Sequence, residues 1–498
     1  MLDLIIKGAT VIDGSGSVGT ILDVAIEGDR IISIAPNIEA ESAEILNATG
    51  LVLSPGFIDV HSHDDFHVLI EPEVRHNILQ GITTVIVGNC GFGAAGSDAG
   101  KIQMKAINEP SADLPDWAGY AGYLEEVDKA SPALNVAALI GHHTARREAM
   151  GGVADRPPSD SELAGMLANV TEGMEAGAVG LSTGLVYEPG RYASTEEVVA
   201  LSKVVGKHGG LYVSHMRDEG SGLLDSVQET LHIGEASGTA VEISHHKSVG
   251  KTNWGMVTQS LEMIEEAIAQ GRDVTADQYP YTARSTMLFA LIQNGTFNDS
   301  EGGAMGKSEP SEVLLCSVPG HEDYEGRTLQ SFVDEFDLPG EEAANKLLRD
   351  YSDSILVAAF GMDEGDVRMV MAHSSTMIGT DGLDRGSKPH PRAWGTYPRV
   401  LGKYVREEGV ISLENAIYKM THMPAAKFGI ANRGLVKEGY FADLVLFDPD
   451  TVIDRATYEN SRIGPAGMPH VIVNGKFAVK DGEHAGSRSG RALRRGQV

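Results

Sequence analysis

The sequence predicts an α/β protein built on a (β/α)8 TIM-type barrel with a small β-sandwich domain beside it. Short apolar runs alternate with helical patterns through the middle of the chain, from about residue 56 to residue 425. Strand-like segments separated by turns occupy both ends, at 1–55 and 426–480. A residue able to bind a metal or a proton ends one apolar run after another. Because such barrels gather their chemistry at the carboxyl ends of their strands, the sequence predicts an active site there.

Length and composition limit the classes of function. The chain has 498 residues, enough for a catalytic domain and an accessory domain. Its net charge of −30 repels nucleic acid and anionic membranes, so neither is expected as a partner. Two cysteines, Cys90 and Cys316, are too few for a disulfide framework, and the sequence shows neither a signal peptide nor a membrane-spanning run. We expect a cytoplasmic protein with a small-molecule substrate, and the oligomeric state stays open.

The two ends of the chain follow one pattern of short strands and tight turns. The predicted strands are Leu4–Ile6, Thr10–Ile12, Asp23–Glu27, Arg30–Ile34 and Gly50–Leu53, then Ala442–Phe447 and His470–Val473. Asn474-Gly475, which follows the last of them, is a favourable hairpin turn. Because these segments flank a long α/β middle, we expect the two ends to meet in one small β domain.

The middle of the chain, 56–425, reads as eight strands that alternate with helices. The strands are expected to end at His63, Cys90, Gly141-His142, Ser182-Thr183, His215, His245, Asp277 to Tyr281, and Asp381. Apolar residues three and four apart predict helices at Asp160–Ala176, Thr195–Lys207, Leu223–Ser237 and Met256–Gln270. This alternation predicts the barrel.

Two segments depart from the barrel pattern. The stretch at about 290–370 is longer than a barrel loop requires and carries helical pieces at Leu329–Phe336 and Glu341–Tyr351. Such an insertion is expected as a lid, although a decorative insertion fits the sequence equally well. The chain ends in a basic tail, 481–498, which we expect to be a solvated terminus rather than a polyanion site.

The pair His61-Ser62-His63 follows the apolar run at 56–60. Side chains two apart on a strand project from the same face, so two imidazoles at this spacing can bind one metal ion. An isolated pair of this kind is as often a surface feature. Here Cys90, His215, His245 and Asp381 end other strands of the same predicted barrel. The presence of these potential ligands at the ends of the other strands favours a metal site.

Further motifs accompany these ligand candidates, at segments 8–14, 55–63, Gly88-Asn89-Cys90-Gly91, Ser244-His245-His246-Lys247, Asn253-Trp254-Gly255 and Asp277-Gln278-Tyr279-Pro280-Tyr281. Together these motifs resemble those of the D-aminoacylases, the N-acyl-D-amino-acid deacylases of the amidohydrolase superfamily. The resemblance extends over nearly the whole chain, from Gly8 to the basic tail. It implies hydrolysis of the N-acyl amide of N-acyl-D-amino acids, giving a carboxylate and a free D-amino acid.

The resemblance also implies a metal centre. A tightly bound Zn²⁺ would be held by Cys90, His215 and His245, and a second, weaker position would be lined by His61, His63 and Asp381. Many amidohydrolases bridge two metals with a carbamylated lysine at the end of the fourth strand. Here that strand ends in a segment without lysine, 180–184, so Cys90 would take the bridging place. Zinc accepts thiolate and imidazole and activates water near neutral pH, which agrees with this assignment.

Asp381 is the expected general base and acid. A carboxylate beside the metal can orient the attacking water, take its proton and pass that proton to the departing amine. The alternative is a plain turn residue, because Thr-Asp-Gly is also ordinary turn chemistry. The position of Asp381 at the end of the eighth strand favours catalysis.

The family pattern implies a set of substrate-binding residues: Tyr187, Lys247, Tyr279, Ser285 and Arg392. Arg392 and Lys247 would lie near the substrate α-carboxylate, which suits the two parallel hydrogen bonds that arginine donates. A tyrosine would lie near the scissile carbonyl.

Two features disagree on the preferred substrate side chain. The apolar segment Met287–Ile292 favours neutral or hydrophobic D-amino acids, the expectation adopted here, with Arg284 pointing to solvent. Arg284, where relatives often carry glycine, could instead bind a second carboxylate and select N-acyl-D-glutamate or N-acyl-D-aspartate.

Two further classes of function fit a barrel of this kind. One is a cyclic amidase of the dihydropyrimidinase or dihydroorotase kind, and the missing fourth-strand lysine counts against it. The other is a non-catalytic barrel scaffold. Scaffolds of this kind typically lose metal ligands, so the complete set of ligand candidates in this chain counts against it.

Overall fold

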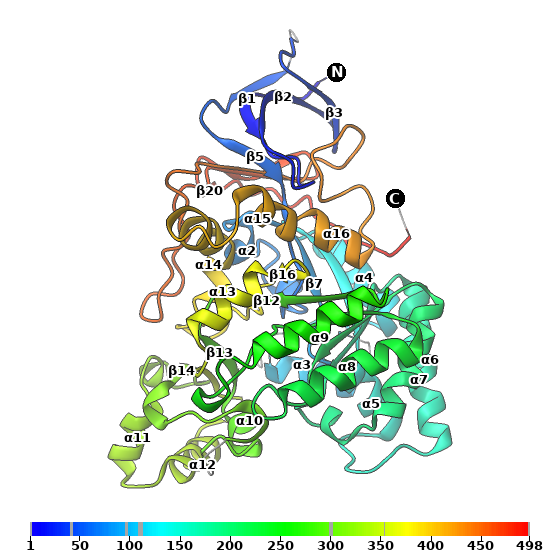
Figure 1. The fold of residues 1–498 in the computed structure, drawn as a ribbon, viewed down its shortest axis with the longest axis vertical. Coiled ribbons are helices and arrows are strands. Elements are labelled where there is room, and N and C mark those ends of the chain that lie inside the picture. The colour runs from blue at the N-terminus through cyan, green and yellow to red at the C-terminus, as the bar shows by residue number, and fades with distance from the viewer. Residues whose placement is uncertain are drawn as a thin grey trace.

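The computed structural model has a barrel of eight parallel strands at its centre (Figure 1). It describes residues 2–39, 43–94, 98–107, 113–297, 302–352 and 354–496. In chain order the barrel strands are β6 (Phe57–Asp59), β7 (Ile82–Val87), β8 (Asn135–Gly141), β9 (Gly180–Gly184), β10 (Leu211–His215), β11 (Ala240–Ile243), β12 (Val274–Gln278) and β16 (Thr376–Ile378). Each of the eight strands predicted from the sequence is present, so the barrel is confirmed.

Amphipathic helices cover the barrel (Figure 1). The α-helices are α1 (His67–Ile70), α2 (Arg75–Ile78), α3 (Asp98–Ile107), α4 (Gly119–Ala130), α5 (His142–Met150), α6 (Asp160–Ala176), α7 (Thr195–Lys207), α8 (Leu223–Ser237), α9 (Val257–Ala269), α10 (Leu288–Gln293), α11 (Leu329–Phe336), α12 (Gly340–Asp350), α13 (Glu364–Ala372), α14 (Arg392–Arg399), α15 (Leu413–Met420) and α16 (His422–Phe428). A π-helical segment, Val400–Glu407, continues α14. No helix in the described ranges is long and apolar enough to span a membrane.

The helix boundaries follow from local capping chemistry. The Ser159 side chain accepts a hydrogen bond from the Glu162 backbone amide, and the Glu162 side chain accepts one from the Ser159 amide. This reciprocal capping box starts α6, and Gly177 ends it in a left-handed conformation with φ of 106°. The predicted bounds of α6, α7 and α8 are confirmed, and α9 is one residue shorter at each end than predicted.

The first and last barrel strands close the barrel without a regular ladder. β6 and β16 are the two ends of the eight-stranded sheet, and only an isolated bridge between Ser62 and Gly382 joins them among the described residues. The Asp381 amide donates to the His61 carbonyl at 2.7 Å, and the His63 amide donates to the Gly382 carbonyl at 3.2 Å. This seam therefore lies directly at the predicted active site.

Strands from both ends of the chain meet in one β domain, as the sequence predicted, and they form a single nine-stranded sheet. Its strands are β1 (Leu4–Val11), β2 (Thr20–Glu27), β3 (Arg30–Ala35), β4 (Glu44–Asn47), β5 (Val52–Pro55), β17 (Leu444–Phe447), β18 (His470–Val473), β19 (Lys476–Lys480) and β20 (Glu483–His484). β17 pairs antiparallel with β5, which joins the two ends. The two strands predicted at 4–6 and 10–12 are one strand with an irregularity between Ile6 and Ala9, where Gly8 has a φ of 72°.

The insertion contains a small sheet as well as the predicted helices. β13 (Ala283–Met287), β15 (Leu356–Phe360) and β14 (Val313–Ser317) form an antiparallel sheet in that order. α11 matches its predicted bounds, and α12 begins and ends one residue earlier than predicted. In Figure 1 these elements lie at the end of the molecule opposite β1 to β3. The expected insertion at about 290–370 also includes 298–301 and 353, which are outside the described residues.

The basic tail packs against the barrel, so the expectation of a solvated terminus is wrong for its described part. The Leu493 amide donates to the Val136 carbonyl at 2.7 Å, near the start of β8. Arg491 forms an ion pair with Asp29 at 2.9 Å, and Arg494 forms one with Asp128 at 2.8 Å. These partners lie far away in the sequence, which is why the tail alone gives no sign of them.

Lys419 in α15 leads to a prediction about stability. Its buried ammonium donates to the backbone carbonyl of Thr376, the first residue of β16, at 2.9 Å, and to that of His373 at the end of α13. Burial lowers the pKa of Lys419 from 10.5 to about 8. Between these values the unfolded chain binds more protons than the folded protein, so raising the pH favours folding. The stability of the wild type relative to Lys419→Met should rise by about 3 kcal/mol across this window.

Denaturant unfolding of both proteins at several pH values measures this difference directly. Other lysines and tyrosines titrate in the same range, but they are common to both proteins and cancel. If the two stability curves run parallel from about pH 7 to about pH 10.5, Lys419 keeps an ordinary pKa and the prediction is wrong.

Candidate active site

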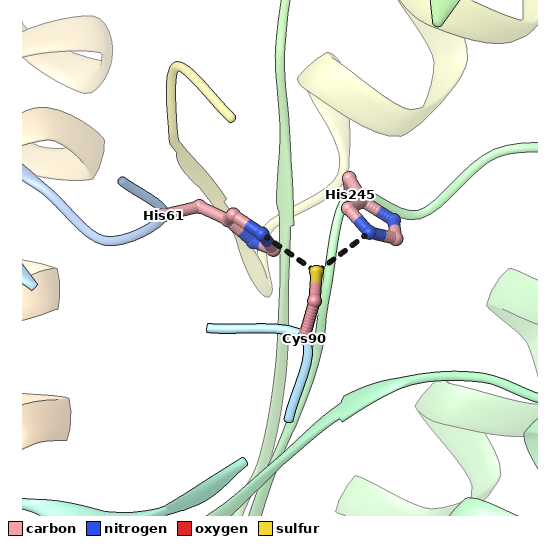
Figure 2. A group of neighbouring side chains, drawn as sticks. All are labelled: His61, Cys90 and His245. Atoms are coloured by element: carbon pink, nitrogen blue, oxygen red, sulfur yellow. Dashed lines mark hydrogen bonds between the residues drawn. The ribbon is translucent and has the colours of Figure 1, made fainter. Parts of the chain in front are cut away.

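The residues predicted as metal ligands lie together at the carboxyl ends of the barrel strands. They are His61 and His63 after β6, Cys90 after β7, His215 at the end of β10, His245 after β11 and Asp381 after β16. Two groups of them are close enough to hold a metal: His61 with Cys90 and His245, and His61 with His63 and Asp381. Figure 2 shows the Cys90 sulfur pointing between the rings of His61 and His245. The strands therefore bring together ligands that are up to 320 residues apart, from 61 to 381.

The distances around Cys90 fit a zinc site. Its Sγ lies 3.3 Å from His61 Nε2, 3.4 Å from His215 Nδ1 and 3.6 Å from His245 Nε2. The ligand atoms of His215 and His245 are 2.8 Å apart. Around a tetrahedral zinc ion such atoms are roughly 3.3–3.6 Å apart, so small rotations of the imidazoles suffice. One thiolate with two imidazoles is also the donor set that zinc prefers among divalent ions.

The environment of Cys90 favours the thiolate form. Burial opposes ionisation of its thiol, but the imidazoles of His61 and His215 hold the pKa well below its usual range. A thiolate is the form that binds metals. Cys316, in contrast, lies in the insertion, where burial raises the pKa of its thiol to about 12. The two cysteines of the chain therefore have opposite chemistry.

Asp381 connects the second group of ligands to the substrate side of the site. Its Oδ1 lies 3.2 Å from His63 Nε2 and 3.6 Å from His61 Nε2. Its Oδ2 lies 2.8 Å from the Arg392 guanidinium. Burial favours the neutral acid, but Arg392 and His61 hold the pKa of Asp381 well below its usual range. The carboxylate therefore stays ionised and able to accept a proton.

The fourth barrel strand contributes no side chain to this centre. β9 ends in Gly184, and a Cβ added there would lie 2.2 Å from the Cys90 carbonyl oxygen. The close approach of the two backbones leaves no space for a lysine at this point. The geometry agrees with the prediction that Cys90 stands between the two metal positions.

Three of the ligand candidates have a left-handed backbone. The φ angles are 54° at Cys90, 36° at His245 and 47° at Asp381. For residues other than glycine this region costs on the order of 1–3 kcal/mol, and such residues concentrate at functional sites. Each of the three follows the end of a strand, and this conformation turns its side chain toward the shared centre.

Asp277, at the end of the seventh barrel strand, orients two of the histidines. Its Oδ2 lies 3.1 Å from His61 Nδ1, and its Oδ1 accepts a hydrogen bond of 2.9 Å from the His245 amide. A carboxylate on the far nitrogen of a metal-binding histidine fixes the tautomer and the ring orientation. The sequence placed Asp277 at a strand end but indicated no role for it.

Glu219 is a functional candidate that the sequence reasoning missed. Its Oε1 lies 2.9 Å from His245 Nδ1 and accepts a hydrogen bond of 2.5 Å from Lys247 Nζ. Its Oε2 lies 3.9 Å from His215 Nε2. Glu219 stands four residues after His215, and this spacing is the signal that could have identified it. The carboxylate orients His245 and anchors Lys247, and it lies close to the ring of His215.

A cavity of about 330 Å³ opens above these ligands, which is the size of a small-molecule site. All five residues predicted to bind substrate line it: Tyr187, Lys247, Tyr279, Ser285 and Arg392. The insertion adds Met305 and Leu356, and α3 adds Ile102 and Ile107. The insertion therefore forms part of the pocket wall, as a lid would.

Three neighbours fix the position of the Arg392 side chain in this cavity. Besides its ion pair with Asp381, it donates to the Ser285 carbonyl at 3.4 Å. Its guanidinium lies 4.5 Å from the centre of the Tyr279 ring, a cation–π contact. Only 2% of Arg392 is exposed, so its charge faces the pocket rather than bulk water. A carboxylate that enters the pocket meets a fixed cation.

Arg284 also belongs to the pocket, and the expectation that it points to solvent is wrong. It lies on β13, is 5% exposed and lines the cavity. Its Nη2 donates to Ser308 Oγ at 3.3 Å, while Nε and Nη1 have no hydrogen-bond partner among the described residues. Of the apolar segment at 287–292, only Met287 and Phe289 line the cavity. The pocket thus combines a partly unpaired buried guanidinium with apolar walls.

Comparisons with known proteins give a consistent family. The Amidohydrolase family profile matches residues 44–302 and 367–479. The D-aminoacylase of Alcaligenes xylosoxydans xylosoxydans is 39% identical over 99% of this chain and 98% of its own length. The N-acyl-D-glutamate deacylase of the same organism is 38% identical over 99% of this chain and 97% of its own.

Solved structures agree with the sequence comparisons. The N-acyl-D-glutamate deacylase from Bordetella bronchiseptica, complexed with zinc and a phosphonate inhibitor, has a TM-score of 0.88 and 35% identity, and covers 99% of both chains. A dihydropyrimidinase from Brevibacillus agri shares the fold at a TM-score of 0.60, with 15% identity. This chain therefore belongs to the amidohydrolase family, in the branch of the D-aminoacylases.

Proposed function

We propose that this protein is a zinc-dependent hydrolase that cleaves the N-acyl amide of N-acyl-D-amino acids into a carboxylate and a free D-amino acid. The observation that carries the proposal is the convergence of Cys90, His215 and His245, with Asp381 nearby, beneath a pocket that contains arginine. The named activities of the relatives support it, and the D stereochemistry rests on them. The absence of a lysine in β9 disfavours a cyclic amidase.

The metal would be held by Cys90, His215 and His245, and His61, His63 and Asp381 would line a weaker second position. Bound there, zinc supplies Lewis acidity that activates water and polarises the scissile carbonyl. Glu219 and Asp277 keep His245 and His61 in the orientation that this centre requires.

Asp381 is the proposed proton carrier. Its ionised carboxylate takes a proton from the attacking water and delivers it to the leaving nitrogen as the amide bond breaks. His63, 3.2 Å away, and Arg392, 2.8 Å away, fix the orientation of this carboxylate. Arg392 also offers the substrate α-carboxylate a partner, with Lys247 on another side of the same cavity.

The pocket supports an acidic substrate side chain. A buried guanidinium that lacks partners is costly, and a second carboxylate at Arg284 would satisfy its free N–H groups. The methylene groups of such a side chain would pack against Met287 and Phe289. We therefore propose N-acyl-D-glutamate or N-acyl-D-aspartate as the preferred substrate, in place of the neutral side chains that the sequence favoured.

Arg284→Gly tests this preference. For N-acetyl-D-glutamate the variant should lose about 2–5 kcal/mol in kcat/KM, because a desolvated carboxylate is left without its partner. For N-acetyl-D-leucine and N-acetyl-D-methionine the loss should be much smaller. Steady-state kinetics on the three substrates measures both effects.

Arg392→Ala is the matched comparison, because it removes a guanidinium from the same pocket. Every N-acyl-D-amino acid carries an α-carboxylate, so this variant should lose activity on all three substrates to a similar extent. A wild-type preference for N-acetyl-D-leucine, unchanged in Arg284→Gly, would instead support neutral side chains. No deacylation of any N-acyl-D-amino acid by zinc-loaded wild type would refute the proposed activity.

A further inference from the structure

A second cluster of metal-binding side chains lies outside the proposed catalytic centre, on the seam where the barrel closes. It consists of His67 at the start of α1, His76 in α2 and Asp384 in the segment after β16. One ligand atom from each lies within 4.8 Å of the others. None of these residues belongs to the ligand set described above, and none lines the substrate cavity.

His76 is oriented as a metal-binding histidine would be. Its Nε2 lies 3.1 Å from Asp64 Oδ1, and the other oxygen of Asp64 accepts hydrogen bonds from Asn77 Nδ2 at 2.6 Å and Ser62 Oγ at 2.8 Å. The opposite ring nitrogen, Nδ1, faces Asp384 Oδ2 at 4.0 Å. A carboxylate on one nitrogen and a free coordination direction on the other is the arrangement that tunes histidine ligands in metal sites.

Asp384 and His67 complete the cluster from two other directions. The Oδ1 atom of Asp384 accepts hydrogen bonds from Trp394 Nε1 at 3.1 Å and Arg462 Nε at 3.0 Å, so these groups hold the carboxylate with Oδ2 toward His76. The His67 ring stands edge-on to the His76 ring, with 4.9 Å between their centres. The His67 side chain is 17% exposed, which leaves an entry path from solvent.

The charge of this region also favours a cation. Asp64 is buried, and only 8% of the Asp384 side chain is exposed. Among the ion pairs of the described residues, Arg462 pairs with Asp384 and no lysine or arginine pairs with Asp64. Asp64 has His76 as its ion-pair partner. A divalent ion between His67, His76 and Asp384 would balance the charge of this second carboxylate.

We propose that His67, His76 and Asp384 bind a structural Zn²⁺ ion, with Asp64 as the carboxylate that orients His76. Two imidazoles and one carboxylate form a donor set that suits zinc, and water or Glu71 could complete a tetrahedral shell. This ion takes no part in the hydrolysis. The proposal rests on the geometry of the cluster and stands independently of the proposed function.

The position of the cluster indicates what the ion would do. β6 and β16 share no regular ladder, and the cluster joins the chain that follows β6 to the chain that follows β16. Asp384 lies three residues after Asp381, whose backbone amide already bonds to His61 across the seam. An ion here would link the segments that follow β6 and β16, and so stabilise the closure of the barrel next to the proposed proton carrier, Asp381.

Zinc titration of metal-free, full-length protein tests the proposal. Bound zinc per chain and the melting temperature are measured after free metal is removed. We expect His67→Ala and Asp384→Asn each to bind one zinc ion fewer than the wild type and to show a smaller zinc-dependent rise in melting temperature. Cys90→Ala should retain this ion, so the result does not depend on the catalytic metal.

Glu71→Gln is the matched control. Its carboxylate lies 3.7 Å from His67 Nε2 and is 71% exposed, and its loss should leave the number of bound zinc ions unchanged because water can replace it. Crystals of zinc-loaded wild type provide a test that needs no variant. An anomalous difference peak among His67, His76 and Asp384 is expected. No peak there, with zinc present at Cys90, or equal zinc binding by wild type, His67→Ala and Asp384→Asn, would overturn the proposal.

Discussion

Cys90→Ala should abolish tight zinc binding at the catalytic centre, and hydrolysis with it. Without the thiolate, the ligand candidates left around His215 and His245 are imidazoles and carboxylates, and such a site binds zinc more weakly than one that includes thiolate. His61 loses the contact of 3.3 Å that joins it to the centre. The expected result is protein that has lost the catalytic zinc ion after dialysis, and that shows no turnover above the uncatalysed rate.

Metal analysis and kinetics on the same sample check this result, with Cys316→Ala as the matched control. Cys316 is equally buried, but it lies in β14, and burial keeps its thiol protonated. Its replacement should leave zinc content and turnover as in the wild type. Full zinc occupancy with normal turnover in Cys90→Ala would rule out the proposed centre.

The barrel and its ligands are predictable because strand periodicity fixes where side chains point. Each barrel strand is a short apolar run, and the residue that ends it faces the same edge as its neighbours. His61, Cys90 and Asp381 therefore come together although the sequence gives no distances. The helices α6 to α8 were predictable for a local reason, since apolar residues recur three and four apart within each of them. Ser159 and Gly177 also mark the two ends of α6.

Features that depend on contacts distant in sequence were not predictable. Arg284 faces the pocket because β13 pairs with β15, where Arg284 lies opposite Ala359. The sequence near position 284 does not indicate this pairing. Asp277 gains its role only from its contacts with the His61 ring and the His245 amide. The basic tail pairs with Asp29 and Asp128, which lie far away in the sequence. In each case the surroundings of a charged side chain come from residues distant in the sequence, so the local sequence pattern does not reveal them.

Asp381→Asn should reduce kcat by roughly 10²–10⁴-fold while the protein stays folded and loaded with zinc. Asparagine keeps the size of the side chain and can still accept a hydrogen bond from Arg392, so the pocket should hold its shape. It cannot take a proton from water or return one to the leaving nitrogen. The loss should therefore appear mainly in kcat, with a smaller change in KM.

The Asp381 prediction is checked by kinetics together with zinc analysis of the same sample, because the two possible roles of this residue differ there. If Asp381 is the proton carrier, its replacement slows turnover while Cys90, His215 and His245 still hold the metal. As a turn residue, it would affect stability through the seam that its amide forms with His61 and leave turnover nearly intact. A loss below about tenfold with zinc retained would assign Asp381 the structural role.

The pH dependence of the two proteins should also differ from that of an ordinary carboxyl group. Because Arg392 and His61 hold the pKa of Asp381 low, the wild-type carboxylate should stay ionised at acidic pH. Raising the pH should not restore the base that Asp381→Asn lacks.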